Sequence, residues 1–254
     1  LALLAAVRVY AEGQLRGMGF KRWRGDRALV FWVRRGRDES ECARREQVAG
    51  AGAVPSMGAS RFALPPLFVL HGLGFGIVPY VRFVRALLDE RRTIVLPEFP
   101  NISLGWADNR CHTPPTSQQY AEALNAMLHS LCDANGQAHT RCDAIGHSYG
   151  TIVLNYWNSH FPSSLRRRVL IDCLSFCTSF HRWVTFAYEY CLKGWPELIA
   201  ANARLGWIKC FAMWFTKGDL AVQQVGKRHT YFMEMIAPEG TINENCMVVL
   251  GGQD

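Results

Sequence analysis

The sequence lacks the long apolar runs that a membrane span requires. No apolar stretch in its 254 residues approaches the roughly 18 residues that predict a transmembrane helix. Its nine cysteines include no C-x-x-C pair, and no second Cys or His pair accompanies Cys173 and Cys177. A metal site is therefore not expected. The odd cysteine count and the apolar surroundings of many cysteines favour a reducing, intracellular compartment over an oxidising one.

Little net positive charge lies outside the N-terminal part of the chain. The net charge is +7, but residues 1–61 hold 12 Lys and Arg against 6 Asp and Glu, so residues 62–254 carry only +1. No basic stripe with interleaved aromatic residues occurs in that remainder, which argues against nucleic acid as a partner. At this length, with 49% hydrophobic residues, the chain can bury the core of one α/β domain.

Residues 1–60 form a basic N-terminal segment. Residues 1–25 are expected to form a helix with arginines and aromatics, among them Arg16 and Trp23. Such a helix either lies on a membrane surface or packs a few apolar residues on the body of the protein, and the sequence leaves both open. Residues 28–33 predict a strand. The charged and glycine-rich stretch that follows predicts a partly mobile loop.

The segment most informative about function is Gly146-His147-Ser148-Tyr149-Gly150. It follows an apolar run that predicts a buried strand, and it precedes a run with apolar residues at helical spacing. A serine between two glycines at such a turn is typical of a nucleophile elbow. The serine is held in a strained turn, and side chains at the flanking positions would collide with the neighbouring strand or helix. The alternative is a structural turn with an inert serine.

A second glycine-rich turn lies earlier in the chain. Residues 67–70 are apolar on both faces and predict a buried parallel strand, which runs into His71-Gly72-Leu73-Gly74. This turn lacks the G-x-G-x-x-G and G-x-x-x-x-G-K patterns of nucleotide sites. Nucleotide binding is therefore not expected, and no cofactor is predicted.

Strands and helices alternate through the rest of the chain. Apolar runs predict strands at residues 92–97, 141–145, 168–172 and 246–250. Apolar residues at helical spacing predict helices at residues 80–88 and 114–131. Ser117 is the expected N-cap of the last of these helices. The alternation predicts an α/β fold with a mostly parallel, doubly wound sheet. Its ligand crevice is expected at the carboxyl ends of the strands.

Residues 174–245 have a different, aromatic-rich character. They hold four of the eight tryptophans, Trp183, Trp195, Trp207 and Trp214. We predict a helical cap or lid here, inserted between two parts of the core at 61–173 and 246–254. An apolar cap suits a hydrophobic substrate. The aromatic residues could equally form only the cap's own core.

The His-Gly turn followed by Gly-x-Ser-x-Gly resembles the α/β-hydrolase superfamily, and residues 65–254 in finer detail resemble poorly characterised fungal and algal members. The resemblance implies a serine hydrolase of esterase or lipase type with Ser148 as the nucleophile. It implies an oxyanion hole made by the backbone N–H groups of Leu73 and Tyr149, and a structural role for His71.

In this superfamily the triad follows the chain order Ser, acid, His. Asp254 follows a strand and a glycine turn, as the superfamily acid does, and Asp172 at another strand end is the alternative. All eight histidines precede Asp254. His147 is expected to point away from the nucleophile, and His181 and His229 lie in the predicted cap. We therefore expect a C-terminally truncated chain, inactive alone, whose catalytic histidine lies beyond its last residue.

These inferences predict a hydrolase acting on a small ester or other acyl substrate, hydrophobic in character. Two alternatives stay open. One is a non-catalytic α/β-hydrolase fold that binds a ligand or a partner. The other is an acyltransferase that uses the same serine.

Overall fold

The structure, a computed structural model, describes residues 2–25, 29–36, 64–103, 114–133, 136–174, 237 and 241–250. In chain order they form α1 (Ala2–Gly17), β1 (Lys21–Arg24), β2 (Val30–Arg34), β3 (Leu67–Leu70), the 3₁₀ helix η2 (Val78–Tyr80), α3 (Val81–Ala86), β4 (Ile94–Glu98), η3 (Pro100–Ile102), α4 (Ser117–His129), β5 (Cys142–His147), α5 (Tyr149–His160), η4 (Pro162–Ser164), β6 (Leu165–Ile171) and β7 (Cys246–Val249). The predicted cap lies almost entirely outside the described residues, so the division into core and cap stays a prediction.

Seven strands form one sheet in the order β1-β2-β4-β3-β5-β6-β7. β2 is antiparallel to both of its neighbours, and every neighbouring pair from β4 to β7 is parallel. The helices α3, α4 and α5 follow β3, β4 and β5 in the chain, as expected of parallel strands joined by helical crossovers. The predicted α/β fold with a mostly parallel, doubly wound sheet is confirmed.

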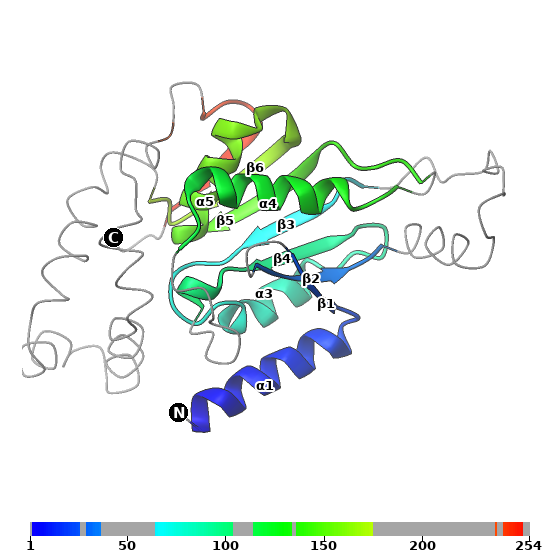
Figure 1. The fold of residues 1–254 in the computed structure, drawn as a ribbon, viewed down its shortest axis with the longest axis vertical. Coiled ribbons are helices and arrows are strands. Elements are labelled where there is room, and N and C mark those ends of the chain that lie inside the picture. The colour runs from blue at the N-terminus through cyan, green and yellow to red at the C-terminus, as the bar shows by residue number, and fades with distance from the viewer. Residues whose placement is uncertain are drawn as a thin grey trace, which may run out of the picture.

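Helices cover both faces of this sheet (Figure 1). Phe68 packs with Trp157 of α5 in the core on the face of α4 and α5, while its neighbour Val69 joins Leu15 of α1 and Val84 of α3 on the other face. Successive strand residues point to opposite faces. A strand covered on both sides must therefore be apolar throughout, and all four residues of β3 are buried.

The N-terminal helix is shorter than the sequence predicted. It ends at Gly17 rather than extending to residue 25. Gly19 adopts a φ of +88°, in the left-handed region that glycine tolerates. The chain then continues as β1, where Trp23 pairs with Phe31 of β2. The predicted helix over 1–25 was therefore wrong in its last turns, because pairing with β2 provides backbone hydrogen bonds that helical spacing does not reveal.

The start of α4 also differs from expectation by one residue. Thr116, not Ser117, is the N-cap. Its side chain accepts a hydrogen bond from the Gln119 N–H at 3.2 Å, and the Gln119 side chain accepts one from the Thr116 N–H at 3.0 Å. This reciprocal pair is a capping box, which satisfies two N–H groups that a helix start leaves without intrahelical partners.

Two buried or partly buried carboxylates, at opposite ends of the strands, form ion pairs that tie segments to the sheet. At the start of β5, Asp143 accepts hydrogen bonds from Arg92 and Arg166. Burial alone would raise the pKa of Asp143, but the bonds from these two guanidinium groups outweigh it and lower that pKa. At the end of β4, buried Glu98 lies 2.9 Å from the guanidinium of Arg8, which holds α1 against the sheet.

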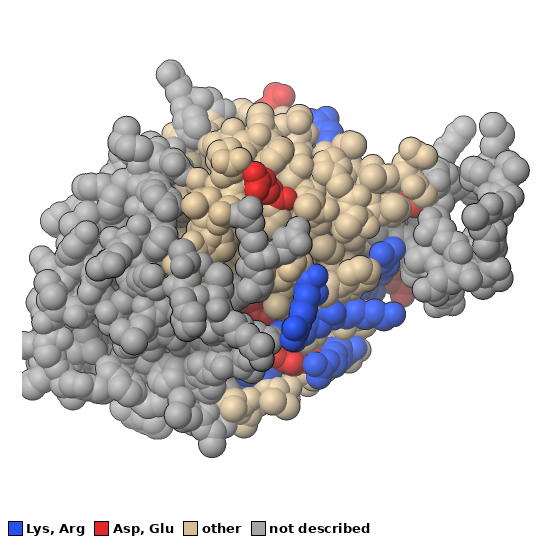
Figure 2. All heavy atoms as spheres, in the orientation of Figure 1, with Lys and Arg blue, Asp and Glu red and all other residues tan. Residues whose placement is uncertain are grey.

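Basic side chains gather on one part of the surface. In Figure 2 they lie mainly where Figure 1 draws β1 and the adjoining end of α1. The described basic residues of this region include Arg16, Lys21, Arg22 and Arg24. None of the helices within the described ranges has the length and apolar character needed to cross a membrane.

Candidate active site

Ser148 occupies a strained turn between β5 and α5. Its φ of 51° and ψ of −119° lie outside the regions that residues with a side chain normally occupy. A Cβ on Gly150 would lie 2.3 Å from the Leu70 carbonyl oxygen of β3, and one on Gly146 would lie 2.8 Å from the Gly150 oxygen. Both contacts are too short for a real side chain. Glycine is thus required on both sides of the turn that presents the serine hydroxyl.

The glycine-rich turn after β3 lies directly beside the elbow. A Cβ on Gly72 would come within 3.0 Å of the Ser148 Cβ, so there is no room for a side chain between the turn and the serine. Gly74 donates its N–H to the Ile102 carbonyl at 2.8 Å, and Gly72 donates to the Tyr80 hydroxyl at 2.7 Å. Within the described part of the chain, the Leu73 N–H between them makes no hydrogen bond.

His71 is hydrogen-bonded both to this turn and to the residue after β4. It is buried, its Nε2 accepts the Phe99 N–H at 3.1 Å, and its Nδ1 lies 2.7 Å from the Gly72 carbonyl oxygen. These partners require a neutral ring with its proton on Nδ1. Burial lowers the pKa of His71 from 6.5 to about 4, against the raising effect of the Gly72 carbonyl. The ring is therefore neutral at pH 7.

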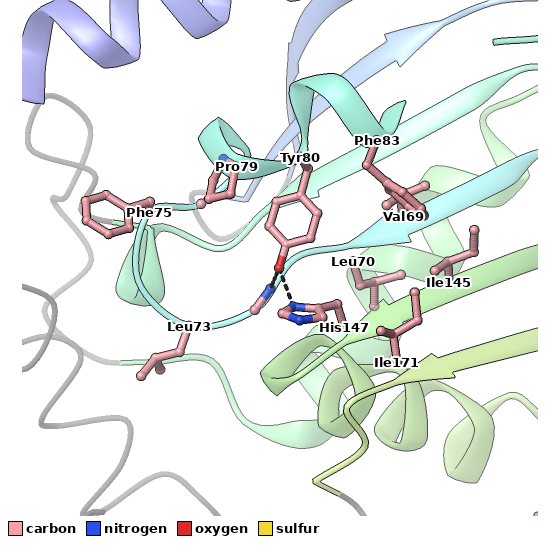
Figure 3. Close-up of a pocket in the computed structure, with 12 residues that line it drawn as sticks. Val69, Leu70, Leu73, Phe75, Pro79, Tyr80, Phe83, Ile145, His147 and Ile171 are labelled. Atoms are coloured by element: carbon pink, nitrogen blue, oxygen red, sulfur yellow. Dashed lines mark hydrogen bonds between the residues drawn. The ribbon is translucent and has the colours of Figure 1, made fainter. Parts of the chain in front are cut away.

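A hydrogen-bonded chain of side chains joins the turn to the elbow (Figure 3). The Tyr80 hydroxyl lies 2.6 Å from His147 Nδ1. On the other side of the ring, His147 Nε2 is 3.5 Å from the Asp172 carboxylate. Burial raises the pKa of the Tyr80 phenol, although the Gly72 N–H partly offsets this effect, so the phenol keeps its proton. Its oxygen accepts the Gly72 N–H, and its own O–H can donate to His147 Nδ1 when that nitrogen carries no proton.

A cavity of about 500 Å³ lies beside the hydrogen-bonded side chains of Tyr80 and His147. It reaches the elbow through His147 and the glycine-rich turn through Gly72 and Leu73. The rest of its lining is mostly apolar and comprises Val69, Leu70, Phe75, Gly76, Pro79, Tyr80, Phe83, Ile145 and Ile171. Figure 3 shows Tyr80 and His147 as the polar side chains facing each other at this site.

Most of the residues predicted for the site lie at one edge of the sheet. Leu73, Ser148 and Asp172 follow the carboxyl ends of β3, β5 and β6, and Tyr149 is the first residue of α5. Asp254, together with His181 and His229, falls outside the described residues. The roles assigned to these residues stay predictions. His147 is directed at Tyr80 and Asp172, and no described histidine hydrogen-bonds to the Ser148 hydroxyl.

Sequence reasoning did not identify Tyr80 as part of the site. It is 67 positions away from His147 in the chain, and no local pattern links the two. The sequence around Tyr80 predicted only a helix, from the apolar spacing of residues 80–88. Within the ranges that the structure describes, no group of three or more His, Cys, Asp or Glu residues could hold a metal ion.

Comparison with known proteins identifies the family. Residues 67–241 match the model of the alpha/beta hydrolase family. This match covers more than half of the chain, which therefore belongs to that family. The assignment supports hydrolysis of a small-molecule substrate as its general chemistry. A search of curated protein sequences finds no match.

Solved structures share the fold at low sequence identity. A bacterial membrane phospholipase A is 15% identical with a TM-score of 0.51, over 100% of this chain and 76% of that one. MGS-M2, an alpha/beta hydrolase from a Medee basin deep-sea metagenome library, is 9% identical with a TM-score of 0.51, over 91% and 88%. The 2-hydroxy-6-oxo-6-phenylhexa-2,4-dienoate hydrolase of Rhodococcus sp. strain RHA1 is 14% identical with a TM-score of 0.50, over 92% and 81%. At these identities the likeness establishes the fold alone.

The close contact at Gly150 gives the first prediction. Gly150→Ala should lower the free energy of unfolding by at least about 3 kcal/mol, because backbone atoms cannot move aside as a side chain can. Gly13→Ala in α1 is the matched control. Nothing lies within 4 Å of its added Cβ, and we expect a gain of about 0.5–1 kcal/mol there. Urea unfolding measures both, and equal effects would contradict the proposed constraint.

The buried neutral His71 gives the second prediction. Its pKa is about 4 in the folded protein, against the ordinary histidine value of 6.5. The unfolded chain therefore binds more protons between these values, and stability falls as the pH drops from 6.5 to 4, by at most about 3 kcal/mol. His71→Gln should remove this part of the pH dependence. Urea unfolding from about pH 7.5 to pH 4.5 tests it, and parallel curves for the two proteins would contradict it.

Proposed function

We propose that the protein is a serine hydrolase that cleaves esters or other acyl substrates through Ser148. The observation that carries the proposal is the strained conformation of Ser148 at the elbow, beside a turn whose Leu73 N–H faces no described acceptor.

The Ser148 oxygen attacks the substrate carbonyl carbon and passes its proton to a histidine base. The N–H groups of Leu73 and Tyr149 stabilise the oxyanion. The intermediate then expels the alcohol, which takes up that proton. Water releases the acyl group by the same steps.

We assign the acid of the triad to Asp254 and keep Asp172 as the alternative. The Asp172 carboxylate already lies 3.5 Å from His147 Nε2, and the other ring nitrogen of that histidine is bonded to Tyr80. The His147 ring is thus committed away from the serine. In this proposal the base is a histidine outside the described residues, and the acid that orients it is Asp254.

We further propose that the substrate is hydrophobic. The cavity beside the elbow is lined largely by aliphatic and aromatic side chains, including Val69, Phe83 and Ile171. A pocket of this size and lining suits an alkyl or aryl group. An acyl or alcohol chain placed there would lie next to the turn that stabilises the oxyanion.

Labelling of the serine tests this proposal. An alkyl fluorophosphonate should form a covalent adduct on Ser148 in the protein expressed from its complete reading frame, and Ser148→Ala should abolish it. Long-chain probes should react faster than a methyl probe, because the cavity binds the chain. Peptide mass spectrometry locates the adduct. Ser159→Ala removes an exposed hydroxyl near the end of α5 and is the control that should still be labelled.

Two other outcomes separate the alternative functions. Absence of labelling at Ser148 in a folded protein would favour a non-catalytic binding protein, for which the lack of a described histidine at the serine is the supporting observation. Labelling combined with an ester product in the presence of an alcohol acceptor would favour an acyltransferase. In that case the acyl-enzyme formed on Ser148 is transferred to the alcohol instead of water.

The N-terminal region supports a second part of the proposal, contact with an anionic membrane surface. Val9 on α1 is 68% exposed and Trp23 on β1 is 43% exposed. The side chain of Arg16 is 62% exposed, and Lys21 is exposed as well. Exposed apolar and basic groups together are the combination that binds the interface of anionic lipids.

Vesicle sedimentation tests this contact. The protein should bind phosphatidylserine-containing vesicles more tightly than phosphatidylcholine vesicles, and Lys21→Glu should weaken that binding by about fivefold or more. Arg167→Glu, an equal charge change at an exposed position of β6, is the matched control and should have a smaller effect. Equal binding to both lipids would contradict the contact.

A further inference from the structure

The glycine-rich turn after β3 is held by hydrogen bonds on both sides of Leu73. Gly74 donates to Ile102 at the end of η3, at 2.8 Å. Gly72 donates to the phenol of Tyr80 at 2.7 Å. The first bond fixes the outer side of the turn. The second connects the residue directly before Leu73 to η2, which leads into α3.

Tyr80 connects that turn to the elbow as well. Its hydroxyl is hydrogen-bonded to His147 Nδ1 at 2.6 Å, and His147 directly precedes Ser148. One phenol therefore bonds the residue before the predicted oxyanion donor and the residue before the predicted nucleophile. A neutral His147 ring that accepts this bond at Nδ1 carries its proton on Nε2, the atom that lies 3.5 Å from the Asp172 carboxylate.

The close packing of turn and elbow does not fix their relative position by itself. An added Gly72 Cβ would lie 3.0 Å from the Ser148 Cβ, but packing of carbon atoms has little directional preference. Hydrogen bonds are directional, and their strength falls steeply when the angle is poor. Two bonds to one oxygen therefore restrict sliding of the turn along the elbow. A shift of about 1 Å between reacting groups can lower a rate by roughly 100-fold.

We propose that Tyr80 and His147 form a positioning pair that sets the distance between the oxyanion turn and the nucleophile. This inference rests on the proposed serine hydrolase function. Tyr80 and His147 act through the backbone of Leu73 and Ser148, and neither transfers a proton to the substrate. Tyr80 restrains the turn through its bond to Gly72, and its bond to His147 restrains the elbow relative to the turn.

Fluorophosphonate kinetics with variants of the full-length protein test the pair. Tyr80→Phe removes both hydrogen bonds and keeps the ring, so the maximal rate of Ser148 phosphonylation should fall by about 10- to 100-fold. The concentration of probe for half-maximal rate should change little, because the cavity lining is retained. Tyr10→Phe, at a tyrosine that is 68% exposed on α1, is the matched control and should react like the wild type.

Variants of His147 test whether Tyr80 and His147 act as one unit. His147→Asn places an oxygen near the position of Nδ1 and should keep much of the wild-type rate, whereas His147→Leu should be as slow as Tyr80→Phe. The double variant Tyr80→Phe with His147→Leu should be no slower than the slower single variant, because the two residues act as one unit. Additive losses would overturn the proposed pair, as would a wild-type rate for Tyr80→Phe.

Nitrogen-15 NMR of the His147 ring separates failure of the pair from failure of the proposed function. In the wild type, Nε2 should carry the proton and Nδ1 should accept, and Tyr80→Phe should shift the Nδ1 resonance. This measurement needs no reactive serine. A wild-type protein that fails to label but shows this ring signature would refute the hydrolase proposal and retain the hydrogen-bonded pair. An unchanged Nδ1 resonance in Tyr80→Phe would overturn the pair itself.

Discussion

The close approach of the first turn of α5 to the end of β3 is the constraint on which the site depends. The Leu70 carbonyl leaves no room for a Cβ at Gly150, so the helix can begin this close to the strand only with glycine there. That position in turn forces the backbone at Ser148 into its unusual φ of 51°. It also places the serine Cβ so close to Gly72 that a Cβ added there would lie 3.0 Å from it. Strain at one residue is maintained because the packed sheet and helix on either side over-determine it.

Neutral polar side chains then fix the turn that faces the serine. His71 bonds it from below, and Tyr80 bonds it from the side of α3. Burial favours the uncharged form of both groups, lowering the pKa of His71 and raising that of Tyr80. Their hydrogen bonds therefore keep the same donors and acceptors near neutral pH. Donors that are fixed before the reaction stabilise developing charge without a cost of reorganisation, which is the property that an oxyanion turn requires.

Much of the fold and part of the site could be predicted from the sequence. Continuous apolar runs identified the strands buried on both faces, and the glycines around Ser148 identified the elbow. The capping box has a local signature, Thr116-x-x-Gln119, which the choice of Ser117 as N-cap missed. Local patterns could not reveal where α1 ends, because β1 is defined by pairing with β2. They could not reveal the contact of Tyr80 with His147, which depends on tertiary packing. The assignment of Asp254 and the cap remains a prediction because both fall outside the described residues.

A crystal structure of the fluorophosphonate-treated protein would show whether the elbow and the turn together form an oxyanion site. We expect phosphorus bonded to the Ser148 oxygen. The phosphonyl oxygen should lie about 2.7–3.1 Å from the N–H groups of both Leu73 and Tyr149, with the alkyl chain in the apolar cavity. An adduct on another residue, or a phosphonyl oxygen directed away from the Leu73 N–H, would contradict it.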